Sequence, residues 1–237
     1  MRAAAGMSAN FVPGTLGTEL NAARAQSGNL TAPPPNDPTY AKGALIAAAL
    51  APGLAPYVSA RGGIGAQFEA GIIYSGRAAR VDARRSWNWD DVSLSLGIGF
   101  SYIFYGNGGD SSALPYVDLN SIHGYGGDIP ILIGWQSSAR LFLAWAGVRG
   151  GWENATISAL SSTPQASAGA APNTQVELTG TRFYAGGLAG IAAGFRHIHV
   201  ALEIDASYET VSGNYVSTPV TVSGLTLAPG AALWIDF

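Results

Sequence analysis

The stretch HIHVALEIDASYE, residues 197–209, contains the residue types best suited to chemistry in this chain. It places two histidines and three carboxylates within thirteen residues. Imidazoles and carboxylates can bind a metal ion or act as general acids and bases. His197 and His199, however, would lie only about 7 Å apart along one strand, with no further ligand converging on them. A His-x-His pair alone is a weak signal, so we expect no metal site here.

A second candidate for chemistry is His123, in the stretch NSIHGYGGD. The chain has three histidines, and a hydrolytic site at the rim of a barrel would have to combine His123 with Asp110, Asp118 or Asp128. Such a site also needs a nucleophile held beside its base. The glycines around His123 more simply indicate a shaped loop. We therefore predict no enzyme activity, no catalytic residue and no cofactor, and keep an outer-membrane hydrolase as an alternative.

The composition is unusual for a protein surrounded by water. Only 11% of the residues are charged, against roughly 25% in typical globular domains. Lys42 is the single lysine, cysteine is absent, and the formal net charge is −3. The absence of a basic block argues against a nucleic-acid partner, and the absence of cysteine excludes disulfides and thiolate metal sites. Much of the outer surface is therefore expected to face something other than water.

The N-terminal half contains two segments that bear on targeting. MRAAAGMSANF lacks the apolar core of a signal peptide, so an export signal would have been removed from this numbering. Residues 43–60 carry no charge, but Pro52 and Pro56 interrupt them and argue against a membrane-spanning helix. The apolar segment 42–51, as helix or strand, could instead fold into the interior of a barrel.

Apolar and polar residues alternate along 197–209, and this alternation indicates the structure of the stretch. Ile198, Val200, Leu202, Ile204 and Tyr208 share one face, while the histidines and carboxylates share the other. Successive side chains of a strand point to opposite faces, so this pattern predicts a long strand with one apolar and one polar face.

The same alternation recurs along the chain and predicts ten strands in a single domain, residues 1–237. The predicted strands are 2–11, 56–64, 67–75, 78–87, 91–104, 127–135, 139–152, 180–195, 197–210 and 222–237. Long connections at 12–55, 105–126, 153–179 and 211–221 alternate with tight ones at 65–66, 88–90, 136–138 and near 196, and 76–77 is a short exception. This alternation is typical of membrane β-barrels with short periplasmic turns and long extracellular loops.

These observations predict an all-β fold: a closed antiparallel up-and-down transmembrane β-barrel of about 10 strands, with 8 or 12 as alternatives. Closure is required because an open sheet would leave backbone groups unpaired in hydrocarbon. Aromatic residues gather near predicted strand ends, as in the interfacial girdles of such barrels. An even number of strands puts both termini on the short-turn side, which we expect to be periplasmic.

The last strand, GLTLAPGAALWIDF, ends the chain on Phe237 with Trp234 nearby. It resembles the C-terminal strand of bacterial outer-membrane β-barrel proteins, and the whole pattern resembles small barrels of the OmpA, OmpX and OmpW kind. The resemblance implies a location in the outer membrane and contact with its lipid. It also implies recognition of Trp234 and Phe237 by the barrel-assembly machinery, and a structural, adhesion or narrow-pore role in small-solute transport.

In this interpretation the polar faces line the lumen and form a charge network. The expected members are Arg61, Glu69, Arg80, Asp82, Arg84, Arg140, Arg182, His199, Glu203 and Asp205. Charges removed from water are costly unless paired. We therefore hypothesise that Arg80, Asp82 and Arg84 pair with Glu69, Glu203 or Asp205. Whether the network braces the wall or lines a polar path, and whether the lumen is open or plugged, the sequence leaves undecided.

A soluble lipocalin-like barrel with an apolar ligand is the alternative from a different class. Its apolar faces would point inward and its polar faces outward. The polar faces of 91–104 and 180–195 are poor in charge for a water-exposed surface, which favours the membrane barrel.

Overall fold

The alternating segments pair in chain order and close into a barrel. The computed structural model describes residues 1–27, 37–104, 114, 122–157, 178–215 and 218–237. The strands are β1 Arg2–Asn10, β2 Gly53–Gly65, β3 Phe68–Tyr74, β4 Ala78–Trp89, β5 Val92–Ile103, β6 Ile122–Gln136, β7 Phe142–Ile157, β8 Leu178–Phe195, β9 Ile198–Tyr215 and β10 Thr218–Asp236. Two helices, α1 Gly14–Ser27 and α2 Pro38–Leu50, lie between β1 and β2.

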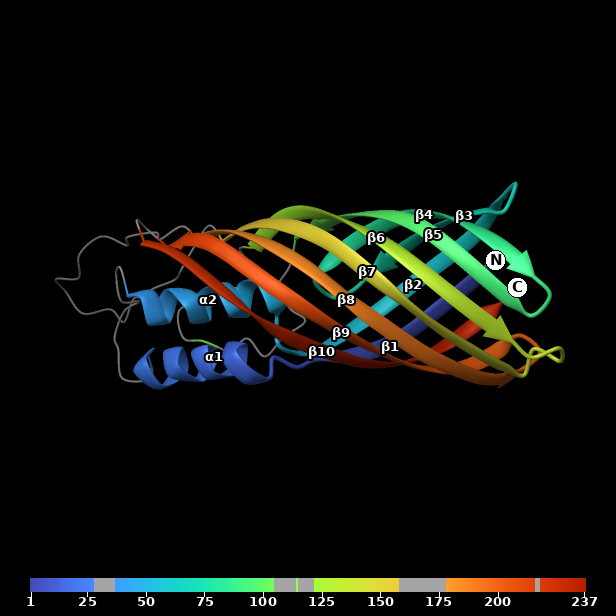
Figure 1. The fold of residues 1–237 in the computed structure, drawn as a ribbon, viewed down its shortest axis with the longest axis horizontal. Coiled ribbons are helices and arrows are strands. Elements are labelled where there is room, and N and C mark those ends of the chain that lie inside the picture. The colour runs from blue at the N-terminus through green and yellow to red at the C-terminus, as the bar shows by residue number, and fades with distance from the viewer. Residues whose placement is uncertain (28–36, 105–113, 115–121, 158–177, 216–217) are drawn as a thin grey trace, which may run out of the picture.

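Each strand pairs antiparallel with its neighbours in the chain, and β1 pairs with β10. The closing register runs from Arg2 opposite Asp236 to Ser8 opposite Gly230. The predicted closed, antiparallel, up-and-down barrel of ten strands is confirmed. Both termini lie at one end of the barrel, here called the turn end, and the helices lie at the other, the helix end (Figure 1).

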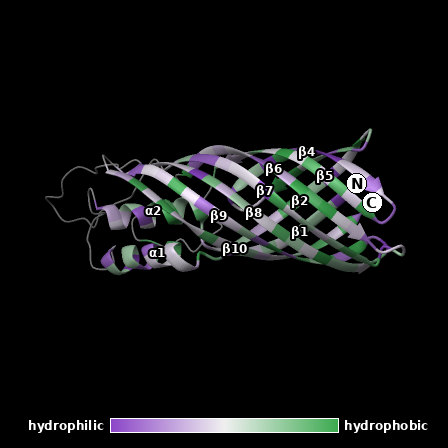
Figure 2. Cartoon of the chain, in the orientation of Figure 1, coloured by the Kyte–Doolittle hydropathy of each residue, from purple (hydrophilic) through white to green (hydrophobic). Residues whose placement is uncertain are grey.

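Apolar side chains are exposed on the outside of the barrel between its two ends. Figure 2 shows apolar residues, in green, recurring along the strands in this region. On β6 this belt runs from Tyr125 to Trp135, with Ile129, Ile131 and Ile133 exposed between them. Ten residues of strand tilted by about 45° span about 23 Å, close to the apolar band of about 25 Å in transmembrane barrels. The predicted outward apolar faces are confirmed, and the inside-out arrangement of a soluble lipocalin-like barrel is wrong for this chain.

Strands β6 to β10 are longer at the helix end than the sequence pattern predicts, because the alternation there reverses its sense. On β9, Thr210 and Ser212 point outward, while Val211 and Tyr215 are buried inside. Outward hydroxyls form a cross-strand ladder, in which Thr221 donates to Ser212 over 3.1 Å. Beyond the belt the barrel is therefore polar outside and apolar inside, as in a soluble protein. We call residues 154–157, 178–181, 210–215 and 218–224 the helix-end extension.

The connection 12–55, predicted as a long connection whose segment 42–51 was left open as helix or strand, contains the two helices. α2 begins with Asp37, which accepts hydrogen bonds from the backbone N–H groups of Thr39 and Tyr40, and with Pro38 in its first turn. It ends at Ala51, whose φ of 41° is left-handed. Almost every residue from Tyr40 to Leu50 is buried. A helix that is apolar all round must be enclosed on all sides.

α2 is enclosed by the barrel itself. It packs against β8, β9 and β10 at the helix end (Figure 1). One hydrophobic cluster joins it to side chains that point inward from β5, β6, β8, β9 and β10: Ile103, Ile122, Leu178, Val211, Tyr215, Val220 and Val222. The segment 42–51 is thus a helix that plugs the lumen. Neither helix in the described part of the chain has the length and apolar character needed to cross a membrane.

α1 covers the helix end of β10, where β10 extends beyond its neighbour β1. The last bridge between β1 and β10 joins Phe11 to Leu227, so residues 218–226 of β10 continue past the end of β1. α1 follows directly and packs on both α2 and β10. A Cβ atom at Gly43 of α2 would lie 2.2 Å from Cβ of Ala23, so this glycine permits the close approach of the two helices. Lys42 and Glu19 form an ion pair of 2.8 Å across the same contact.

Candidate functional site in the barrel lumen

The structure places most of the predicted lumen residues on inward-facing positions. They are Arg61, Glu69, Arg80, Asp82, Arg84, Arg182, His199, Glu203 and Asp205. The prediction of Arg140 as a lumen residue is wrong. Arg140 lies exposed in the turn between β6 and β7, with φ of 54°. The strand starts at Phe142 and not at 139, because Ser137 ties the turn together through its carbonyl and hydroxyl oxygens. The Arg140 carbonyl oxygen lies 3.0 Å from Nε2 of His199.

Two buried aspartates organise the first charge network, on β2, β4, β6 and β7. Asp82 bridges Arg61, at 2.6 Å, and Arg80. Asp128 holds the other side of Arg80 with two hydrogen bonds of 2.8 and 2.9 Å, and lies 3.9 Å from Nε of Arg149. Both aspartate side chains are 4% exposed. The arginines therefore form a chain of shared carboxylates across the wall, as charges in a poorly solvated lumen require.

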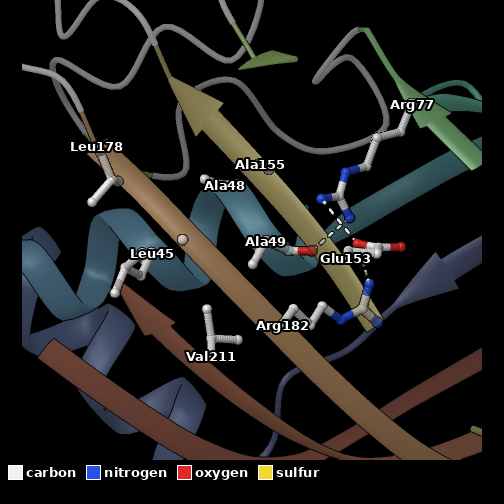
Figure 3. Close-up of a pocket in the computed structure, with 10 residues that line it drawn as sticks. Leu45, Ala48, Ala49, Arg77, Glu153, Ala155, Leu178, Arg182 and Val211 are labelled. Atoms are coloured by element: carbon white, nitrogen blue, oxygen red, sulfur yellow. Dashed lines mark hydrogen bonds and ion pairs between the residues drawn. The ribbon is translucent and has the colours of Figure 1, made fainter. Parts of the chain in front are cut away.

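The second network lies directly beneath α2. Arg182 binds Glu153 at 2.9 Å through Nη1 (Figure 3). It also binds Glu209 through Nε and Nη2. Thr226 donates its hydroxyl to Glu209 over 2.8 Å. These inward-pointing side chains from β7, β8, β9 and β10 form a polar layer next to α2, the plug helix.

Two side chains hold the C-terminal end of α2. Arg77 donates to the carbonyl oxygen of Ala49 over 2.5 Å and pairs with Glu153 at 3.5 Å (Figure 3). Asn10 donates to the carbonyl oxygen of Leu50 over 2.5 Å. The last carbonyls of a helix have no partner within it and carry partial negative charge, which a cation satisfies. Burial lowers the pKa of the Arg77 guanidinium, which lies in the β3–β4 turn, and the neighbouring Glu153 carboxylate opposes that shift.

The hypothesised pairing of Arg80, Asp82 and Arg84 is only partly as predicted. Arg84 does pair with Glu69, directly across β3 and β4, at 3.1 Å. Arg80 and Asp82 pair with each other and with residues on β2 and β6. Glu203 and Asp205 form no ion pair with any of the three in the described structure.

Several network members were missed by the sequence reasoning: Arg77, Asp128, Arg149, Glu153 and Glu209. Arg149 and Glu153 share the inward parity of β7, but glycines and a tryptophan on the same face obscured the pattern there. Glu209 lay on the predicted polar face and could have been included. Nothing in the sequence indicates that Arg77, in a turn, folds back over the lumen.

The histidines do not assemble a catalytic or metal site in the described structure. His123 points outward from β6, whereas Asp128 points inward from the same strand, so these two do not meet. Asp110 and Asp118 lie outside the described residues. His197 is in the β8–β9 turn, and His199 is buried with Nδ1 3.9 Å from Asp236. Within the described ranges, no three metal-ligating side chains converge.

A cavity of about 800 Å³ occupies the lumen between the plug and the turn end. It extends from Leu50 and Ala51, at the end of α2, to residues 88, 90–93 and 134–136 at the turn end. Arg61, Glu69, Arg84, Arg149, Glu203 and Asp205 line its polar part. Trp234 also lines it, with the Arg2 guanidinium 4.3 Å from its ring centroid, while Phe237 is exposed at the turn end.

No protein-family model and no curated protein matches the chain. Among solved structures, Neisserial surface protein A is similar over 100% of this chain and 96% of its own, at 10% identity and a TM-score of 0.32. A major outer membrane protein from Thermus thermophilus is similar over 99% of this chain and 100% of its own, at 10% identity and a TM-score of 0.33. Outer membrane phospholipase A from Escherichia coli is similar over 99% and 90%, at 8% identity and a TM-score of 0.32. The fold assignment itself rests on this chain's own strand pairing.

Proposed function

We propose that this protein is a bacterial outer-membrane β-barrel with a closed lumen, whose role is structural or adhesive and is exerted at the helix end. The apolar belt, bounded by aromatic residues, supports insertion in a lipid bilayer. In the same proposal the helix end faces outside, the termini face the periplasm, and Trp234 and Phe237 serve the barrel-assembly machinery.

The plug helix carries the proposal of a closed lumen. Displacing α2 would expose at least Tyr40, Leu45, Ile46 and Leu50, which are at most 2% exposed. Each large apolar side chain contributes about 1.5–3 kcal/mol on burial, so together they disfavour displacement by about 6–12 kcal/mol. At about 1.4 kcal/mol per factor of ten, α2 would leave the lumen less than about once in 10⁴ molecules. A continuously open pore is therefore disfavoured.

Conductance in planar bilayers tests the closed lumen. Asn10 pairs with Gly53, so a short Gly-Ser hairpin can replace residues 11–52 and remove both helices while preserving the β1–β2 pair. We expect no steady conductance from the wild-type protein and clear channels from the deletion variant, provided that it keeps a heat-modifiable folded band on gels. Steady wild-type conductance would instead favour the second candidate, a narrow path for small solutes, to which the 800 Å³ cavity is suited. A folded but silent deletion variant would contradict the assignment of the plug.

Cysteine labelling tests the orientation, because the chain has no native cysteine. Ala22 is exposed on α1 at the helix end, and Ser138 is exposed in the β6–β7 turn at the turn end. We expect a membrane-impermeant maleimide to label Ala22→Cys in intact cells, and Ser138→Cys only after the outer membrane is permeabilised. The reverse pattern would place the helix end in the periplasm.

A further inference from the structure

We propose that the lumen cavity contains a binding site for an organic cation with an apolar body. Glu203 and Asp205 on β9 supply the negative charge, and Trp145, Trp234 and Tyr57 supply an aromatic surface beside it. All five residues line the cavity of about 800 Å³. The site lies between the plug and the turn end.

The first observation is that neither carboxylate forms an ion pair with any basic residue in the described part of the chain. Six other inward or rim carboxylates form ion pairs with arginine: Glu69, Asp82, Asp128, Glu153, Glu209 and Asp236. Within the described residues, no basic nitrogen lies within the 4.0 Å limit of an ion pair from Glu203 or Asp205. Glu203 accepts a hydrogen bond from Nε1 of Trp145 over 2.6 Å, and Asp205 accepts one from the Ser207 hydroxyl over 2.5 Å.

Arg149 is the arginine that acts on this pair from a distance. Its attraction reaches both Glu203 and Asp205, but its Nε lies 3.9 Å from Asp128 and its guanidinium is 5.3 Å from the ring centroid of Tyr184. It is thus placed toward Asp128 and leaves the two carboxylates facing the cavity. Carboxylates in a partly desolvated lumen favour the uptake of a compensating cation.

The second observation is a group of aromatic side chains on the cavity wall beside Glu203. Trp145 and Trp234 lie with ring centroids 6.0 Å apart. They pack with Tyr57 and with alanines of β8, β9 and β10 in a small hydrophobic cluster. Gly190 makes room for this arrangement, because a Cβ atom there would lie 2.3 Å from Cζ2 of Trp145. The indole therefore lies flat against the wall and reaches Glu203 with its N–H.

Together these features select the ligand chemistry. Aromatic faces attract cations and also bury apolar groups, while the carboxylates, about 7 Å apart along β9, repel anions. A bare metal ion would need at least one more ligand, and no such trio occurs in the described structure. An ammonium or quaternary amine with an apolar body matches both halves of the site. The site does not depend on the plug, since the cavity reaches the turn end.

Benzyltrimethylammonium is a suitable probe, with benzyl alcohol and benzoate as its neutral and anionic counterparts. Binding to the folded protein in a non-ionic detergent is followed by tryptophan fluorescence, since two of the six tryptophans line the site. We expect saturable binding of the ammonium at least tenfold tighter than that of either counterpart. Comparable binding of all three ligands, or no saturable binding, would overturn the proposal.

Variants locate the site. The double variant Glu203→Gln, Asp205→Asn should weaken ammonium binding at least tenfold. Glu19→Gln removes a carboxylate on α1, outside the cavity, and should leave binding unchanged. Equal loss in both variants would show a general charge effect and refute the site. The comparison of the three ligands uses the wild-type protein and therefore remains decisive even if the double variant does not fold.

Discussion

We expect the stability of the barrel to be especially sensitive to substitution of Asp82. Replacing it with asparagine keeps the shape of the side chain and removes the anion that Arg61 and Arg80 share. Arg80 retains its two hydrogen bonds to Asp128. Arg61 has no second ion pair in the described structure, and its Nη1 already lacks a hydrogen-bond partner.

The expected cost follows from burial. Removing one partner of a buried ion pair costs about 3–5 kcal/mol, because the other charge stays buried and uncompensated. The Arg61 side chain is 15% exposed, so we expect about 3 kcal/mol, at the low end of that range. Glu69→Gln is the matched control on the neighbouring strand. Its pair with Arg84 is 40% and 22% exposed, and exposed pairs contribute about 0–1 kcal/mol.

Reversible unfolding in urea, in the presence of phospholipid vesicles, measures both free energies of unfolding. Tryptophan fluorescence and heat-modifiable gel mobility give independent probes of the same transition. Asp82→Asn should be destabilised by at least 2 kcal/mol more than Glu69→Gln, on the order of thirtyfold in the folding equilibrium. Equal effects of the two substitutions would refute the argument that burial of the shared aspartate braces the wall.

Two further substitutions test the belt and the plug. Leu202 and Ser212 both point outward from β9. Leu202→Lys, in the middle of the belt, should lower the free energy of unfolding in vesicles by about 2–4 kcal/mol, whereas Ser212→Lys, on the helix-end extension, should change it by less than about 0.5 kcal/mol. Similar costs for the two variants would place both residues in the same environment. Gly43→Val should force α1 and α2 apart, because even a Cβ atom there meets Ala23 at 2.2 Å. We expect it to destabilise the protein by about 1–3 kcal/mol and to speed proteolysis within α1, and unchanged proteolysis would contradict the close helix contact.

Alternation made the barrel predictable. A membrane barrel repeats one local rule on every strand, apolar outside and small or polar inside, so the faces of the belt strands follow from parity. The alternation of long and short connections favoured about ten strands, with 8 or 12 as alternatives. The same parity found Arg61, Glu69, Arg80, Asp82, Arg84 and Arg182. It failed where the rule changes, in the helix-end extension, because Val211 and Val222 follow the opposite rule of a soluble protein.

The sequence by itself determined the antiparallel barrel and the side on which the belt residues lie, because both depend on spacing along one strand. Which charged side chains form ion pairs depends on which strands face each other across the lumen and on their stagger. Only the tertiary structure decided these pairings. Asp82 therefore joins Arg61, and Asp128 joins Arg80. Among the residues that the structure describes, Glu203 and Asp205 form no ion pair with an arginine. The tertiary structure also decided that residues 38–50 form a helix in the lumen: these apolar residues fit several settings, and the closed wall supplies the one that buries them on all sides.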